Sequence, residues 1–241
     1  MINLIFAIDK KFDLMMTRVI LQINDPAGLA SRADSMGLEL SFAEKVNKST
    51  PEEALKLIES VINQKYEALG DKLETICRWY QKSWDEINDQ FFSFVALKTK
   101  HEWQFSEYFC VVSVIHPGLS NWTSNKIVRI WSENPFDMRK ITAHEMIVAH
   151  IFSIFHNDPK YQGKLEDMQI WKIAEIAGWC LTGLESDIIK LWPWIPKEKL
   201  FYTNHNYPQL VSLQLKLKEV YLKEKDFDKF LDIAINEVKK E

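Results

Sequence analysis

Apolar residues recur at intervals of three and four over most of the chain, which is the spacing of a buried helix face. Three shorter segments are instead rich in β-branched and aromatic residues, as strands are. The predicted helices cover about residues 11–23, 51–69, 73–94, 136–156 and 166–184, with two more within 207–240. The predicted strands cover 2–8, 108–115 and 126–131. We therefore expect an α+β fold that is predominantly helical.

The clearest helix start is the run Ser49-Thr50-Pro51-Glu52-Glu53. A hydroxyl side chain caps the first amides, and proline needs no amide hydrogen in the first turn. The two glutamates face the positive end of the helix dipole. A helix beginning at this point is thus predicted from local chemistry as well as from periodicity.

The strands 108–115 and 126–131 lie on either side of the turn His116-Pro117-Gly118. Segments of this kind, close together in sequence, predict a two-stranded hairpin or a meander. We therefore expect a small antiparallel sheet directly before the helix 136–156.

Composition supports one packed, mainly helical domain over residues 1–241. The 241 residues are 46% apolar and 12% aromatic, which is enough to build a large core. Nine Trp and 14 Phe stand against only seven Gly, whereas sheet proteins use more glycine in turns. Within the domain we distinguish a helical half of about 1–100, a central part of about 104–190 and carboxyl-terminal helices of about 205–240.

The charge pattern and the cysteines indicate which classes of partner and which cellular compartment to expect. The net charge of −4 is spread along the chain, which argues against a nucleic-acid partner. The apolar stretches are shorter than the ~20 residues that cross a bilayer, and the amino terminus has no signal-peptide pattern, so we expect a soluble protein with no membrane partner. Cys77, Cys110 and Cys180 are odd in number and far apart, which favours reduced thiols and a cytoplasmic protein.

Polar chemistry is concentrated in residues 141–155, which read ITAHEMIVAHIFSIF. A helix with this sequence is apolar on nearly every side, so it belongs in the centre of the fold. Ionisable groups on a buried helix are costly unless they are paired or ligated. His144 and Glu145 therefore need partners.

The next predicted helix contains a suitable partner. Glu175 is the single charged residue in the apolar run 173–181. A histidine, an adjacent glutamate and a second carboxylate about thirty residues later are the groups that a zinc hydrolase uses, as metal ligands and as the base that activates water.

Residues 108–184, about a third of the chain, resemble the zincin metallopeptidases of the gluzincin type. In that family HExxH on the active-site helix is completed by a glutamate on the following helix, and the segment 171–177 looks like the one that carries this glutamate. The resemblance implies a zincin-like core over about 104–190, zinc as cofactor, and a peptide or protein as substrate or partner. It implies His144 and Glu175 as zinc ligands, Glu145 as the catalytic base, and the strand 127–131 as the one that pairs with an extended substrate.

The sequence departs from the family at the second histidine. Four residues after His144 stands Val148, whereas four residues is the spacing, about 40° around a helix, that lets two rings reach one metal. His150 lies six residues on and about 240° round, so it is a weaker candidate ligand that requires a π-bulge. The resemblance is thus compatible with a peptidase that has an unusual ligand set and with a relative that has lost catalysis.

Two other interpretations stay open. In the first, His144 and Glu175 form a buried hydrogen-bonded pair without metal, and Trp171 belongs to the core. In the second, the protein is a non-catalytic interaction or dimerisation module that binds through the aromatic face of the helix 73–94. Without a partner, that face would simply pack in the core.

Several loop residues have the chemistry of an oxyanion donor, and their spacing selects none of them. These residues are His116, Tyr161, Tyr202 and His205. We interpret the connector Trp192-Pro193-Trp194-Ile195-Pro196 and the loop 197–206 as structural.

Overall fold

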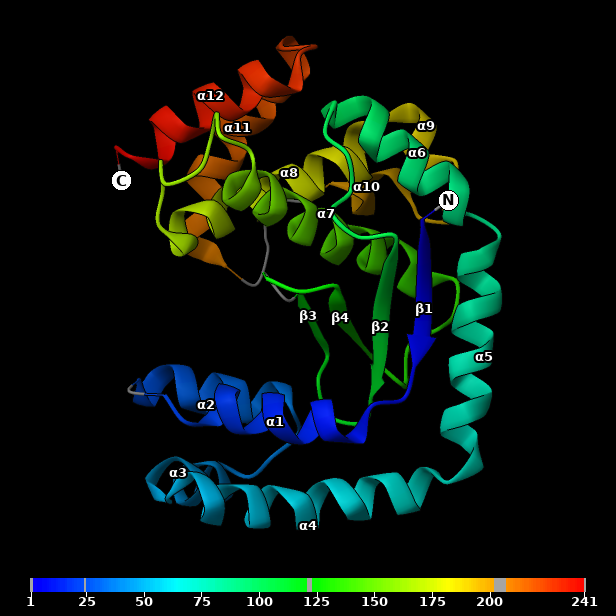
Figure 1. Cartoon of the computed structure of the whole chain (residues 1–241), viewed down its shortest axis with the longest axis vertical. Coiled ribbons are helices and arrows are strands. Elements are labelled where there is room, and N and C mark those ends of the chain that lie inside the picture. Colours follow the sequence, from blue (N-terminus) through cyan, green and yellow to red (C-terminus); the bar gives the residue numbers. More distant parts are fainter. Residues whose placement is uncertain (1, 24, 121–122, 202–206, 241) are drawn as a thin grey trace.

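The structure is a computed structural model that describes residues 2–23, 25–120, 123–201 and 207–240. Its elements are β1 (Asn3–Ala7), α1 (Lys10–Leu21), α2 (Pro26–Ser35), α3 (Leu40–Lys48), α4 (Pro51–Leu69), α5 (Asp71–Asp85), α6 (Asn88–Thr99), β2 (Glu107–Ser113), β3 (Gly118–Ser120), β4 (Lys126–Ile130), α7 (Asp137–Asn157), α8 (Asp167–Leu184), α9 (Ser186–Ile189), α10 (Lys197–Leu200), the 3₁₀ helix η1 (Pro208–Leu210), α11 (Val211–Lys223) and α12 (Phe227–Val238). Helices predominate around a small sheet, which confirms the α+β class (Figure 1). None of the helices in the described ranges has the length and apolar character needed to cross a membrane.

The sheet is mixed, and the predicted antiparallel hairpin is wrong. Its strand order is β1-β2-β4-β3; β1, β2 and β4 run parallel, and only β3 is antiparallel to its neighbour. The segment between β2 and β4 is long enough to return the chain through β3, so these two strands pair in parallel, with Phe109 opposite Lys126. Most residues of both strands are buried, as is usual for parallel strands covered on both faces.

Side-chain amides from two helices cover the outer edge of β1. Gln81 of α5 accepts from the Phe6 amide at 2.8 Å and donates to the Leu4 carbonyl at 3.1 Å. Asn88 donates to the Ile2 carbonyl at 2.8 Å and accepts from the Leu4 amide at 3.2 Å. These bonds satisfy backbone groups that an edge strand otherwise leaves open.

The same contacts explain why the predicted helix 73–94 is two helices. α5 ends at Asp85 and α6 begins at Asn88, with Glu86 and Ile87 between them. The side-chain oxygen of Asn88 also accepts from the Trp84 indole at 3.0 Å. The apolar period continues across the break, so periodicity alone does not reveal it.

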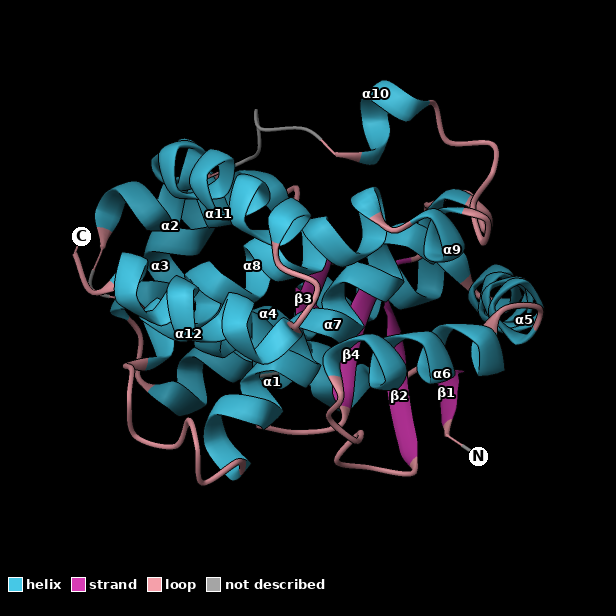
Figure 2. Ribbon diagram, turned by 90° about the horizontal axis from the view of Figure 1, so that it is seen from above, coloured by secondary structure: helices cyan, strands magenta, loops and turns pink. Residues whose placement is uncertain are grey.

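The elements form layers that place α7 at the centre (Figures 1 and 2). α7 packs on β3 and β4, α8 packs on α7, and α11 and α12 cover α8. α5 and α6 flank β1, while α1 to α4 lie together at one end of the sheet. The helix start predicted at Thr50 is confirmed, because its hydroxyl and the Glu53 carboxylate form a reciprocal capping box at the start of α4.

The buried apolar side chains form one cluster that reaches from Leu4 in β1 to Val238 in α12. Cys110 and Cys180 are free thiols inside this core, and Cys77 is a half-buried free thiol at its border. The prediction of unpaired core thiols is thus confirmed for the two buried cysteines.

A buried polar cluster joins α1 to the end of β2. The Asp13 carboxylate is fully buried and accepts from the Tyr66 hydroxyl at 3.1 Å and from the Val114 amide at 3.3 Å. Burial raises the pKa of Asp13 to about 6, although these hydrogen bonds oppose the rise. His116 Nε2 lies 3.0 Å from the Thr17 hydroxyl, and burial lowers the pKa of His116 to about 4.

These two groups should give opposite pH dependences of stability. The folded state favours protonated Asp13, so its contribution to the free energy of unfolding is largest below about pH 4 and is lost as the pH rises through about 6. His116 is favoured neutral, so its contribution is lost as the pH falls from about 6.5 towards about 4. Asp13→Asn should therefore lose more stability than the wild type on acidification from about pH 7 to about pH 4, by about 3 kcal/mol.

Urea denaturation at several pH values measures this difference. His116→Gln should show the converse, a smaller loss on acidification than the wild type. Parallel curves for the wild type and Asp13→Asn would contradict the assignment of the pH dependence to Asp13.

Candidate functional site

α7 is buried along most of its length, as its apolar sequence predicts. Fifteen of its 21 residues are buried, including His144, which is 4% exposed. Its polar side chains must therefore find partners on the elements that pack against it. The structure brings His144, Glu145 and Glu175 together from α7 and α8.

His144 and Glu175 meet across the interface of α7 and α8. Nε2 of His144 lies 3.0 Å from Oε2 of Glu175. A carboxylate only accepts, so Nε2 donates this hydrogen bond. The other carboxylate oxygen, Oε1, accepts from the Trp171 indole at 3.1 Å, and the ring of Trp179 lies 4.8 Å from that of His144. Trp171 and Trp179, one turn before and one turn after Glu175, thus border the pair.

Gly178 lets the histidine ring approach the backbone of α8. A Cβ at this position would lie 2.7 Å from Nδ1 of His144 and 2.9 Å from its Cε1, closer than real Cβ atoms come. Nδ1 is buried and has no hydrogen-bond partner among the described residues. The ring is therefore held by its Nε2 bond and by packing.

Glu145 turns toward the sheet. Its carboxylate accepts a hydrogen bond from Ser120 of β3. Burial raises the pKa of Glu145, the His144 ring opposes the rise and the Glu175 carboxylate adds to it. A carboxyl group with a raised pKa keeps its proton to a higher pH than a free glutamate does.

His150 makes its contacts outside the cluster of His144, Glu145 and Glu175. Its Nε2 lies 3.1 Å from the Thr99 hydroxyl, and its ring lies 4.4 Å from that of Trp103. Burial lowers the pKa of His150 to about 3. Because α7 is an uninterrupted α-helix here, no bulge rotates His150 toward His144, and this weaker candidate ligand is not part of the cluster.

The described residues of the cluster do not fit a catalytic zinc ion. Such sites have three protein ligands and one open position. The position of the second histidine on α7 is occupied by Val148, which is fully buried. Across the ranges that the structure describes, no three His, Cys, Asp or Glu side chains gather in a way that would hold a metal ion. Nε2 of His144 and Oε2 of Glu175 instead bond to each other.

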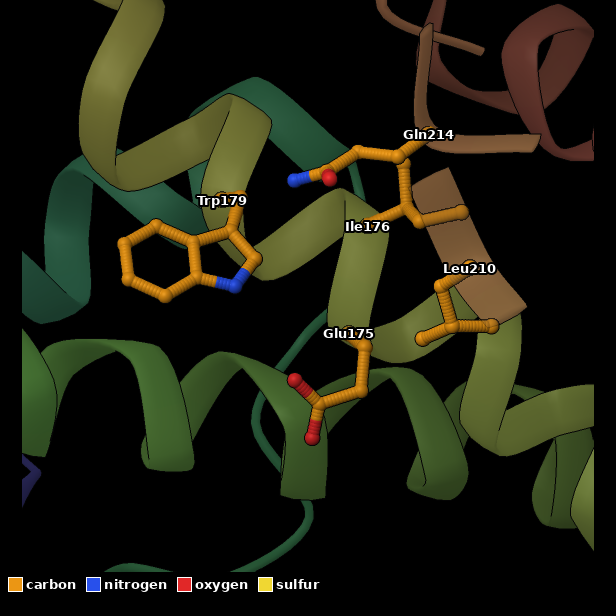
Figure 3. Close-up of a pocket in the computed structure, with 5 residues that line it drawn as sticks. All are labelled: Glu175, Ile176, Trp179, Leu210 and Gln214. Atoms are coloured by element: carbon orange, nitrogen blue, oxygen red, sulfur yellow. The ribbon is translucent and has the colours of Figure 1, made fainter. Parts of the chain in front are cut away.

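The space beside Glu175 is small. A cavity of about 10 Å³ lies between α8, η1 and α11, lined by Glu175, Ile176, Trp179, Leu210 and Gln214. This volume holds about one water molecule and no substrate. Figure 3 shows the lining residues, with the Glu175 carboxylate directed toward α7.

The described oxyanion candidates have structural contacts elsewhere. His116 contacts Thr17, and the Tyr161 hydroxyl donates to Asp228 at 2.9 Å. Tyr202 and His205 lie outside the described residues.

The sequence analysis missed three contributors to the site. Ser120 comes from β3, which was not predicted. Trp179 and Gly178 carry a local signal, since a glycine inside an apolar helix often marks a close approach and Trp179 stands four residues after Glu175.

Comparison of the chain with protein-family models, with curated proteins and with solved structures finds no match in any of the three.

Gly178→Ala should reveal how tightly the two helices meet. Alanine favours a helix interior by about 1 kcal/mol over glycine, but here its Cβ would clash with the His144 ring, so we expect a net destabilisation of about 1–3 kcal/mol. In the background of His144→Ala the same substitution should be neutral or stabilising. Chemical denaturation of the four proteins in this cycle measures the coupling, and equal effects in both backgrounds would refute the contact.

Proposed function

We propose that this chain is a zincin-like protein that has lost the metal site and binds an extended peptide segment beside the cluster of His144, Glu145 and Glu175. The observation that carries the proposal is the direct bond between His144 on α7 and Glu175 on α8, with Glu145 turned to β3. The two helices thus bring together the residues that the resemblance assigns to one metallopeptidase site.

The edges of the sheet support a peptide-binding role and correct the expected substrate strand. β4 has β2 and β3 on its two sides, so its backbone is already paired and cannot accept a peptide. β1 is an edge strand, but Gln81 and Asn88 cover its backbone groups. β3 is the other edge, and an extended peptide that paired with it would lie next to Glu145.

The ligand set argues for binding rather than metal-assisted hydrolysis. The Nε2 proton of His144 is engaged with Glu175, and its ring packs so closely on Gly178 that a Cβ there would clash with Nδ1. Val148 supplies no ligand atom. What the cluster retains is a carboxyl group with a raised pKa and a hydrogen-bonded histidine, next to the edge strand β3.

The rival interaction module lacks the surface that it requires. Tyr80, Trp84 and Phe91 of the aromatic face are fully buried in the core of the chain itself. Trp79, at 56% exposed, lies on the opposite side of α5. A partner cannot bind through a face that the chain already covers.

Metal analysis of the wild type tests the loss of the site. Protein purified without chelator or His-tag should contain far less than one zinc per chain by mass spectrometry, because two ligands do not make a tight site. His144→Ala and Glu175→Ala should leave this content unchanged. Near-stoichiometric zinc that both substitutions abolish would instead indicate a metal-dependent peptidase.

Restoring the missing ligand tests the zincin-like geometry. Val148→His places a second ring about 40° from His144 on the same helix face, so this variant should bind about one zinc ion in calorimetric titration. Adding Glu175→Gln should weaken that binding by about tenfold or more.

Met146→His is the matched control, because Met146 is also fully buried on α7 but lies about 200° from His144. It should bind no zinc at the cluster. A folded Val148→His protein that binds zinc no better than Met146→His would refute the zincin-like arrangement.

A further inference from the structure

A second hollow lies at the start of α7, away from the cluster. It has a volume of about 320 Å³, opens to solvent and is lined by Asn134, Phe136, Asp137 and Trp194. The two aromatic side chains are 51% and 40% exposed, and their ring centroids lie 5.3 Å apart at an angle of 73°. A pocket with aromatic walls and a few polar groups is the usual form of a ligand site.

A buried arginine holds the two rings in place. The guanidinium carbon of Arg139 lies 5.3 Å from each ring centroid. Arg139 itself is 4% exposed, donates to the Ser83 hydroxyl at 2.7 Å and is paired with Glu86. The rings therefore pack on an arginine whose charge is balanced by Glu86, although both rings are partly exposed to solvent.

A carboxylate without an ion pair lines the hollow. Asp137 makes no ion pair with any residue that the structure describes. Arg139, which contacts both rings, has its charge balanced by Glu86. The Asp137 carboxylate is thus a negative charge beside two aromatic rings.

The turn before α7 is ordered by Asn134. Its side-chain oxygen accepts from the Phe136 amide at 2.9 Å, and its carbonyl accepts from the Met138 amide at 3.0 Å. The backbone that carries Phe136 and Asp137 is therefore ordered before any ligand arrives, which lowers the entropy cost of binding.

We propose that this hollow binds the guanidinium group of an arginine side chain presented by a peptide. A guanidinium is flat, stacks on aromatic rings and donates two parallel hydrogen bonds to a carboxylate such as Asp137. The inner sides of the same two rings already carry the guanidinium of Arg139, and its pairing with Glu86 limits repulsion of a second cation. This inference uses none of the residues on which the proposed function depends.

Titration with N-acetyl-arginine amide, followed by NMR, tests the site. The neutral isostere N-acetyl-citrulline amide is the matched ligand. We expect saturable binding of the arginine compound to the wild type, with the citrulline compound weaker by about fivefold or more, because it lacks the charge that faces Asp137. Equal binding of the two compounds, or no saturable binding of the arginine compound, would overturn the proposal.

Two variants with matched controls locate the binding. Asp137→Asn keeps the shape and removes the charge, and Trp194→Ala removes one wall; each should weaken binding by about fivefold. Asp71→Asn changes an acidic residue in the same first-turn position of α5, and Trp79→Ala removes another exposed indole, so both should bind as the wild type does. Circular dichroism confirms that each variant is folded. Unchanged binding by folded Asp137→Asn would overturn the proposal even if Trp194→Ala failed to fold.

Discussion

The burial of α7 is the constraint on which the rest of the structure depends. A helix covered on nearly all sides cannot leave His144, Glu145 or His150 to solvent, so each must meet a partner on a neighbouring element. The sheet supplies Ser120, α8 supplies Glu175, and the end of α6 supplies Thr99. The positions of these elements around α7 are therefore coupled to its polar residues as well as to its apolar ones.

The positions of α4, α7 and α8 could be predicted from the sequence because local chemistry determines them, whereas α2 and α3 were not predicted. The capping residues before α4 and the apolar periods of α7 and α8 act within a few residues, and all three helices lie close to their predicted ranges. The direction of strand pairing could not be predicted, because alternating side chains are compatible with parallel and antiparallel neighbours. The break after α5 was also hidden, since it depends on contacts between Asn88 and β1, which is more than 80 residues away.

Part of the candidate site could also be predicted from the sequence. The need of a buried His144 for an acidic partner, and the isolation of Glu175 in an apolar run, pointed to a pair that the structure brings within 3.0 Å. Helical geometry likewise placed His150 on another face, where it contacts Thr99. The contribution of β3 was not accessible, because a three-residue strand leaves too short a pattern to detect.

The amide side chains that cover β1 have a consequence for the stoichiometry of any complex formed by strand addition. A sheet with two open edges can extend in both directions, so that copies of a chain add one after another into a polymer. Here Gln81 and Asn88 close one side, so among the described strands β3 is the edge that is left for an added strand. Assembly through the sheet would therefore stop at a single added strand, giving a closed one-to-one complex or a symmetric dimer.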